Sequence, residues 1–344
     1  MIKRLLRGVK KRLYQYKLFY PRKKAKAIRW GIIGLGNMAE VFASALDDDR
    51  DSVIAAVASR SKDKATCFAK RHGKPLAYGS YEEMLSDAAL NVDVIYIATP
   101  AKYHAMHIRQ CLDAGKNVLC EKPIASNAEE FRGLIELAEK KQLFLMEGMW
   151  MKCLPPFQIA NRWLEQGRIG NLELVKVDFY KRELVNPKHT IFNVSEGGGV
   201  LHDFGIYAIS FVTAFLGGRP EKVLKESRYS SFRIDADWQI FVERAGVKGF
   251  LNLSSNFKGL SKAALIGDKG FIEWDAQFNR TNKVTRYDEY GKKQEEYVVS
   301  YKSDGFEYEI QEVRRCIQKT MTQSEKVTLS SSLVALELMD KLME

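Results

Sequence analysis

The sequence predicts an α/β domain with a doubly wound parallel sheet, followed by an α+β domain with a large, mostly antiparallel open sheet. Three observations support this fold class. A chain of 344 residues is long for a single core, so two domains are expected. Short apolar runs alternate with helical patterns between residues 28 and 149, which is typical of a parallel sheet. Between residues 150 and 344, strand-forming runs follow one another across short turns, which is typical of antiparallel strands.

The apolar pattern predicts the elements of both domains. In the first domain, strands are expected at 29–33, 53–58, 94–98, 117–120 and 143–146, and helices at 38–46, 62–71, 104–114 and 128–140. The second domain is expected to begin with a helix at 156–165 and to close with helices at 306–320 and 331–343. Its strands are expected at 172–180, 221–231, 237–243, 248–254, 262–266, 271–274, 283–287 and 296–301.

A basic arm, residues 1–27, carries the whole charge excess of the chain. It holds 11 Lys and Arg residues and no carboxylate, whereas the other 317 residues carry 43 cations and 43 anions. Its apolar residues recur every three or four positions and predict an amphipathic helix: Ile2, Leu5, Leu6, Val9, Leu13 and Tyr16. Three interpretations remain open: attraction to an anionic membrane surface, packing on the body or on a partner subunit, or a frayed terminus. Nucleic acid is not an expected partner, because the neutral body has no basic groove or recognisable binding motif.

Cysteine usage and hydropathy indicate in which compartment of the cell the protein is expected. The five cysteines are odd in number and scattered without a CxxC pair, which favours a reducing compartment and argues against a disulfide framework or a metal site. No run of about 18 apolar residues is present, so no membrane span is expected. We therefore expect a soluble, cytoplasmic protein, with the arm as a means of peripheral attachment to the inner face of a membrane.

A glycine motif lies between the first expected strand and the first expected helix. It reads Gly34-x-Gly36-x-x-Ala39 and includes Asn37 and Met38. Gly34 allows a tight turn, Gly36 lets the backbone approach a pyrophosphate, and Ala39 permits close helix packing. The motif in this context predicts a dinucleotide-binding, Rossmann-type domain at residues 28–149.

The end of the second strand bears on which dinucleotide is bound. An enzyme that uses NAD usually offers an acid there to the adenosine ribose, whereas this chain has Ser59, Arg60 and Ser61, with Lys64 one turn into the next helix. These residues suit a 2′-phosphate, so NADP(H) is favoured over NAD(H). The alternative is that Arg60 is only a solvated loop cation.

Further candidate residues follow two later strands of the same domain. Thr99 and Pro100 come after the strand that ends at residue 98, and Glu121 and Lys122 end the next strand. Both pairs should lie at the carboxyl edge of the parallel sheet, beside the cofactor. Lys122 can orient a substrate hydroxyl and lower the pKa of a neighbouring acid, and Glu121 can reach the nicotinamide ribose. His104 either lines this site or makes a structural hydrogen bond at a helix start.

The second domain contributes a glycine run followed by polar groups. Gly197, Gly198 and Gly199 should allow a close approach to another backbone or to a ligand, and Asp203 and Tyr207 follow at helical spacing. Trp150 and the segment before the run supply candidate substrate contacts, namely Arg182, Asn186, Lys188 and His189. His202 is a candidate additional base.

The motifs together resemble the glucose-fructose oxidoreductase and inositol dehydrogenase (Gfo/Idh/MocA) family, from about residue 28 to the C-terminus. Tyr207 in place of the usual histidine, and the run from Phe144 to Trp150, resemble the branch that contains the dimeric dihydrodiol dehydrogenases. The resemblance implies that Lys122, Asp203 and Tyr207 are catalytic and that the open sheet commonly mediates dimerisation.

The resemblance also implies hydride transfer between a nicotinamide and a CH–OH or C=O group of a sugar, polyol or trans-diol. An unperturbed phenol is a poor base near neutrality, so Lys122 is expected to favour the phenolate of Tyr207 and tune it as a general acid or base. Two alternatives remain open: a non-catalytic regulator that binds nucleotide or sugar on the same fold, and an enzyme whose tightly held cofactor is recycled by two sugars.

Overall fold

The structure is a computed structural model that describes residues 27–182, 198–230, 234–275 and 277–344. The expected helix of the basic arm lies outside the described residues, and so do four residues that the sequence analysis singled out: Asn186, Lys188, His189 and Gly197. Within the described residues, no helix combines the length and the apolar character needed to cross a bilayer.

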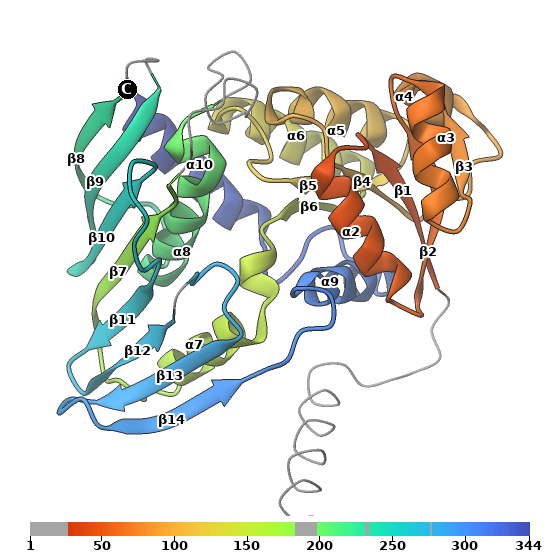
Figure 1. The fold of residues 1–344 in the computed structure, drawn as a ribbon. Coiled ribbons are helices and arrows are strands. Elements are labelled where there is room, and N and C mark those ends of the chain that lie inside the picture. Colours follow the sequence, from red (N-terminus) through yellow and green to blue (C-terminus); the bar gives the residue numbers. More distant parts are fainter. Residues whose placement is uncertain (1–26, 183–197, 231–233, 276) are drawn as a thin grey trace, which may run out of the picture.

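The first domain is built on a six-stranded sheet in the order β3-β2-β1-β4-β5-β6, and every pair of neighbouring strands is parallel (Figure 1). The strands are β1 Ile28–Ile33, β2 Ser52–Ala58, β3 Leu76–Tyr78, β4 Val94–Ile97, β5 Asn117–Glu121 and β6 Leu145–Gly148. The helices are α2 Asn37–Asp47, α3 Lys62–Arg71, α4 Tyr81–Ser86, α5 His104–Asp113 and α6 Ala128–Lys141, with a short 3-10 helix, η1 Ala101–Tyr103. The predicted doubly wound parallel sheet is confirmed, and its direction of winding reverses between β1 and β4.

Local sequence explains where the elements of this domain begin and end. The central strand β4 is apolar on both faces and fully buried, as expected for a strand covered by helices on each side. The side chain of Ser61 caps α3, and Asn127 caps α6, each by accepting a hydrogen bond from a backbone N–H three residues later. The sequence analysis did not predict β3 and α4, because a three-residue strand and a six-residue helix are too short to show a clear period.

The second domain is built on an eight-stranded sheet in the order β14-β13-β12-β11-β7-β10-β9-β8. Its strands are β7 Leu172–Tyr180, β8 Lys222–Tyr229, β9 Asp235–Arg244, β10 Val247–Ser254, β11 Ala263–Gly267, β12 Gly270–Trp274, β13 Lys283–Asp288 and β14 Lys293–Val298. Neighbouring strands are antiparallel except β7 and β10, which are parallel. The predicted, mostly antiparallel sheet is confirmed, but the chain does not simply meander, because β7 lies in the middle.

The last strand begins and ends three residues earlier than predicted. The expected range 296–301 becomes β14 Lys293–Val298, because a tight turn joins it to β13. In that turn Asp288 accepts hydrogen bonds from the backbone N–H groups of Tyr290 and Lys292. A carboxylate that holds a turn in this way fixes the hairpin register.

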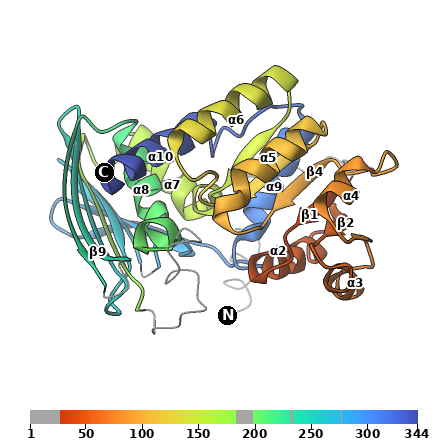
Figure 2. The same cartoon turned by 90° about the horizontal axis from the view of Figure 1, so that it is seen from above.

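Helices cover the face of the large sheet that is turned toward the first domain (Figure 2). They include α7 Pro155–Glu165, α8 Ile206–Leu216 and α10 Leu329–Met343; α8 packs on β7 and β10, and α10 contacts α8 as well as α6 of the first domain. Two short helices lie nearer to the junction of the domains: the 3-10 helix η2 Trp150–Cys153 and the π-helix η5 Leu201–Gly205. Helix α10 thus belongs to the layer that covers the sheet and also joins that layer to the first domain.

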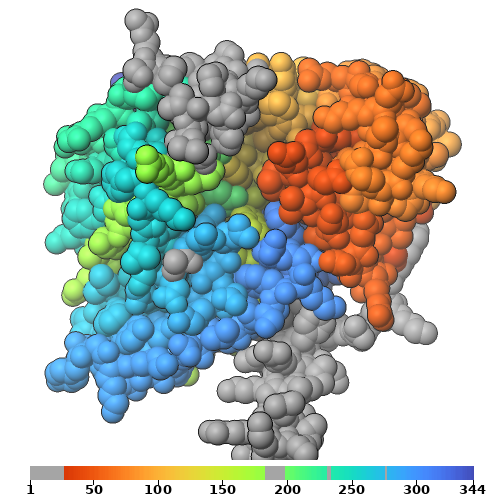
Figure 3. All heavy atoms as spheres, in the orientation of Figure 1, coloured from red at the N-terminus to blue at the C-terminus, as the bar shows by residue number. Residues whose placement is uncertain are grey.

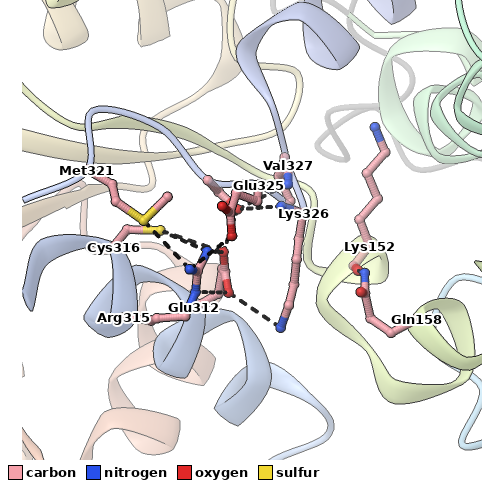
Figure 4. Close-up of polar contacts among 10 residues, drawn as sticks. Lys152, Gln158, Glu312, Arg315, Cys316, Met321, Glu325, Lys326 and Val327 are labelled. Atoms are coloured by element: carbon pink, nitrogen blue, oxygen red, sulfur yellow. Dashed lines mark hydrogen bonds and ion pairs between the residues drawn. The ribbon is translucent and has the colours of Figure 1, made fainter. Parts of the chain in front are cut away.

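Helix α9, Phe306–Gln318, is anchored by a buried ionic cluster (Figure 4). The carboxylate of Glu312 is fully buried and accepts hydrogen bonds from Arg315 at 2.7 Å and Ser324 at 2.8 Å, with the ammonium of Lys326 at 3.4 Å. Burial alone would raise the pKa of Glu312, but these three partners outweigh it and lower the pKa to about 2. The cluster therefore ties α9 to the segment that leads into α10.

Candidate active site

A cavity of about 470 Å³ lies at the carboxyl edge of the parallel sheet, where the winding reverses. All the residues predicted to bind a cofactor line this one cavity: Gly34, Gly36, Asn37, Met38, Ser59, Arg60, Lys64, Thr99, Pro100, His104, Glu121 and Lys122. They come from four separate strand ends. The structure therefore brings together a set of residues that the sequence spreads over 89 positions.

The two glycines of the motif serve different purposes. Gly34 has a φ of +84°, and a Cβ there would lie 2.7 Å from the side chain of Thr99 and 2.8 Å from the backbone of Ala98, so the fold itself requires this glycine. A Cβ at Gly36 would meet nothing within 4 Å. Gly36 is also the N-cap of α2, and no side chain caps that helix end. The first amides of α2 and the open space before them fit a dinucleotide pyrophosphate.

The adenosine end of the cavity is cationic. Arg60 and Lys64 line it together with the buried Ser59, and within the described part of the chain neither cation has a carboxylate at ion-pair distance. Helix α3 holds Lys64 in place, because the hydroxyl of Ser61 accepts a hydrogen bond from its backbone N–H at 3.3 Å. This end of the cavity therefore gathers two cations and a buried hydroxyl.

His104 links the two loops that form the cavity wall. Its Nε2 lies 2.7 Å from the carbonyl oxygen of Thr99, and its Nδ1 lies 2.7 Å from that of Pro123. The ring is only 1% exposed, and burial lowers the pKa of His104. Because each ring nitrogen lies against a backbone carbonyl, the ring sits between the loops that carry Thr99 and Lys122, and in its neutral form it donates a hydrogen bond to one of the two carbonyls.

A second cavity, of about 670 Å³, lies between the first domain and the open sheet. Its inner wall is aromatic, formed by Trp150, Phe179, Phe204, Tyr207 and Phe306. The surface is hollowed where the first domain, in orange, meets the sheet domain, in green to blue (Figure 3). The two cavities share the wall residues Met38, Glu121, Lys122 and Asp203. A cofactor in the first cavity and a substrate in the second would meet at these four residues.

The predicted catalytic residues are in contact with one another at this junction. The ammonium of Lys122 donates a hydrogen bond to the backbone carbonyl of Asp203 and lies 5.2 Å from the centre of the Tyr207 ring. The indole N–H of Trp150 donates to the phenol oxygen of Tyr207 at 3.1 Å. The carboxylate of Asp203 lies 3.3 Å from the ammonium of Lys181. Tyr207 and Lys122 therefore stand side by side, each held by a second residue.

The expectation that Lys122 favours the phenolate of Tyr207 is wrong for this structure. Burial raises the pKa of Tyr207 well above 10, and the nearby carboxylate of Glu121 raises it further, against a smaller lowering by the hydrogen bond from Trp150. Glu121 is itself buried, its pKa is raised by burial, and it accepts a hydrogen bond from Tyr96 at 2.6 Å. Tyr207 is a neutral phenol at neutral pH.

Gly199, just before the helix that carries Asp203, makes a tight contact with β9. Gly199 has a φ of +114°, and a Cβ there would lie 1.8 Å from the carboxylate of Asp235. That carboxylate accepts a hydrogen bond from the backbone N–H of Leu201 at 2.9 Å, where the π-helix begins. Gly199 thus allows a close approach, but the group that approaches is the side chain of Asp235, where the sequence analysis expected another backbone or a ligand. His202 faces the cofactor cavity, and its Nδ1 is buried without a hydrogen-bond partner among the described residues.

The sequence analysis missed most of the residues at the outer part of the second cavity. Arg182 lines it as expected, but Lys181, Lys258, Gln277, Asn279 and Arg280 were not singled out. They lie just after or between strands of the open sheet. The position of a residue at a strand end was the available signal, but the strand order that brings these ends together cannot be read from the sequence.

Comparison with known proteins assigns both domains. Residues 28–149 match the GFO/IDH/MocA oxidoreductase family, NAD-binding Rossmann fold, and residues 157–273 match the GFO/IDH/MocA C-terminal domain. The chain is 33% identical to the trans-1,2-dihydrobenzene-1,2-diol dehydrogenase of Xenopus laevis over 92% of this chain and 98% of that protein. It is 31% identical to the human enzyme of the same name, over 92% and 96%.

Solved structures share the fold. A mutant 3-ketoreductase from Actinomadura kijaniata, in complex with TDP-benzene and NADP, matches with a TM-score of 0.81 and 22% identity, over 92% of this chain and 97% of that chain. The aldose-aldose oxidoreductase from Caulobacter crescentus, complexed with glycerol, matches with a TM-score of 0.80 and 21% identity over the same shares.

Proposed function

The chain belongs to the GFO/IDH/MocA family of NAD(P)-dependent oxidoreductases, and we propose that it interconverts an alcohol and a carbonyl on a sugar, polyol or trans-diol, with NADP(H) preferred over NAD(H). The observation that carries this proposal is the pairing of Lys122 and Tyr207 where the two cavities meet. The relatives named dehydrogenases of a trans-diol support the substrate class. The cations Arg60 and Lys64, in the absence of an acid at the end of β2, support the cofactor preference.

The protein residues supply binding, orientation and the proton. A bound nicotinamide supplies or accepts the hydride. In reduction, Tyr207 donates its phenolic proton to the substrate oxygen, because its raised pKa keeps it protonated. Lys122 lies beside the ring and stabilises negative charge that develops on the same oxygen. The hydrogen bond from Trp150 orients the phenol, and the bond from Lys122 to the carbonyl of Asp203 orients the ammonium. In oxidation, Tyr207 accepts the proton, and Trp150 and Lys122 stabilise the phenolate.

A Tyr207→Phe variant tests the proposed role of the phenol. We expect turnover of keto-sugars, polyols and trans-diols with NADPH or NADP⁺ to fall by about 100-fold, the usual order for a lost proton donor, while NADPH affinity stays unchanged. Tyr229→Phe is the matched control, because Tyr229 is 56% exposed on β8 and lines neither cavity. Full activity of Tyr207→Phe would overturn the assignment.

Two results with the parent chain would favour the alternative functions. Cofactor binding without turnover of any substrate would favour a non-catalytic regulator, and cofactor that stays bound through desalting would favour an enzyme whose tightly held cofactor is recycled.

We also propose that the open sheet mediates homodimerisation. Its face opposite α8 presents a row of apolar side chains across three neighbouring strands, in which Leu224 and Phe250 both pair with Phe241 in the strand register. Leu224 is 56% exposed and Phe250 is 41% exposed. A contiguous apolar row on a sheet face is typical of an interface. Light scattering of the purified chain tests this, and a monomer at micromolar concentration contradicts it.

The basic arm remains a candidate for membrane attachment in the cytoplasm. Its 11 cations and apolar face motivate that proposal. Sedimentation with anionic liposomes, with and without residues 1–27, tests it, and equal retention of both forms in the supernatant contradicts it.

A further inference from the structure

The outer part of the substrate cavity carries an excess of cations. Arg182, Lys258 and Arg280 line it, and within the described residues none of them has a carboxylate at ion-pair distance. One exposed carboxylate, that of Asp304, lines the same cavity alongside these three cations. The chain beyond the basic arm carries equal numbers of cations and anions, and the excess at the cavity is therefore local. Cations gathered without counterions repel one another and attract an anion.

Strand topology explains how three distant segments place these cations together. Arg182 follows the end of β7, Lys258 lies in the connection from β10 to β11, and Arg280 lies in the connection from β12 to β13. Strand β11 pairs antiparallel with both β7 and β12, so its start lies beside the ends of those two strands. All three segments are thus at the same end of the open sheet.

The residues that line the cavity differ in burial between its inner and outer ends. The aromatic residues Trp150, Phe179 and Phe306 are buried, whereas Arg182, Lys258 and Arg280 are exposed. Lys122 and Tyr207 lie with the aromatic residues, at the inner end where the cofactor cavity begins. The cations therefore form the mouth of a cavity whose reactive groups lie deeper.

We propose that the substrate carries an anionic group, a phosphate ester or a carboxylate, which the mouth of the cavity binds while the reacting CH–OH reaches Tyr207. This inference rests on the proposed function and specifies the substrate class of the same site. Arginine offers a planar fork that matches the oxygen atoms of both groups, and lysine adds a compact charge. A neutral diol or sugar would leave Arg182, Lys258 and Arg280 without a counterion in the complex.

Calorimetric titration in the presence of NADP⁺ tests this inference. The probes are glucose 6-phosphate, glucuronate and UDP-glucose, each compared with glucose. We expect at least one anionic probe to bind about tenfold more tightly than glucose, and added salt to weaken that preference. The three probes distinguish a phosphate monoester, a carboxylate and a diphosphate as the recognised group.

Substitutions at the mouth locate the binding site. Lys258→Gln and Arg280→Gln are each expected to weaken the binding of the preferred anionic probe by about fivefold, and together by about 20-fold. The affinity for glucose should not change. Lys269→Gln is the matched control, because Lys269 is an exposed cation in the β11–β12 turn, at the opposite end of the same strands. It should bind every probe as the parent chain does. Thermal denaturation checks that the variants fold.

The outcomes separate this inference from the proposed function. Anionic probes that all bind no more tightly than glucose, or a double variant that binds them as the parent chain does, would overturn the inference even if neutral diols are turned over. Binding of an anionic probe that the double variant loses supports the inference even if no substrate is turned over, in which case the proposed function fails alone.

Discussion

The proposed preference for NADP(H) can be tested at the end of the cofactor cavity where we expect the adenosine to bind. Arg60 and Lys64 line that end, and neither is engaged in an ion pair with a described carboxylate. A 2′-phosphate would bring nearly two negative charges to them, whereas NADH has only a hydroxyl there. A charge-assisted hydrogen bond between exposed groups contributes about a tenfold change in affinity. We expect Arg60→Ala and Lys64→Ala each to weaken the binding of NADPH about tenfold.

The double variant gives a sharper expectation. Arg60 and Lys64 would contact the same phosphate, so their effects should not be fully additive, and the combined loss should be about 30-fold to 100-fold. NADH affinity should change less than about twofold, which makes NADH an internal control for folding. Fluorescence titration with both dinucleotides measures all of these affinities.

A neighbouring lysine provides a matched control for that experiment. Lys62 is also exposed and lies on the same helix as Lys64, but its ammonium donates to the carbonyl oxygen of Ala77 at 2.6 Å and it does not line the cavity. Lys62→Ala should leave the ratio of NADPH to NADH affinity unchanged. The reasoning is refuted if the parent chain binds NADH more tightly than NADPH, or if Arg60→Ala weakens both dinucleotides equally.

Three further predictions follow from the structure. Gly36→Val should leave the thermal midpoint nearly unchanged, because a Cβ at Gly36 meets no atom of the described residues within 4 Å. It should weaken the binding of NADPH more than about tenfold by filling the space at the helix start, and a midpoint that drops while NADPH affinity stays intact would contradict this. Because the pKa of Tyr207 is raised, kcat/KM for carbonyl reduction should stay flat between about pH 6 and pH 9 while that for oxidation rises with pH, and a reductive limb that falls near pH 7 would show a lowered pKa instead. Glu312 has a pKa of about 2 against an ordinary 4.5, so its ionised form contributes about 3 kcal/mol above pH 5, and this is lost as the pH falls through 2. In urea unfolding, Glu312→Gln should therefore have a lower free energy of unfolding than the parent chain, by nearly that amount at pH 7 and by less toward pH 3. A difference that stays constant with pH would contradict the assignment.

The cofactor site of the parallel sheet was predictable from the sequence because a geometric rule connects the order of the strands to the positions of the residues that follow them. Strands of a doubly wound sheet end at the same edge, so residues that follow separate strands must lie together there. Arg60, Thr99 and Lys122 are each separated by more than 20 positions, and the rule alone placed them around one cavity. The bounds of the helix Lys62–Arg71 were predicted to the residue from the apolar pattern, and the structure shows that Ser61 caps its start.

The open sheet offers no such rule, and the mouth of the substrate cavity was therefore missed. Antiparallel strands end alternately at opposite edges, so a residue at a strand end belongs to the cavity only if the strand order is known. Lys258 and Lys269 both lie in connections of the same sheet, yet they sit at opposite ends of β11. The central place of β7, between β11 and β10, depends on long-range packing that neither propensity nor turn residues encode.

The pKa of Tyr207 is raised, whereas the sequence analysis predicted that it is lowered. This difference shows why the chemical role of a residue is harder to predict than its position. From the motifs alone, a lysine near a phenol implies a lowered pKa, since opposite charge favours the ionised form. Desolvation acts in the other direction, and here it is the larger effect, with the carboxylate of Glu121 adding to it. Burial depends on Trp150 and on Phe306, which stacks against it at 4.6 Å, from elements that lie about 60 and 100 positions away from Tyr207. A neutral phenol beside a cation is already the state that carbonyl reduction requires, whereas oxidation must begin by removing the proton. The pH dependence of the two directions should therefore differ, although the same two side chains serve both.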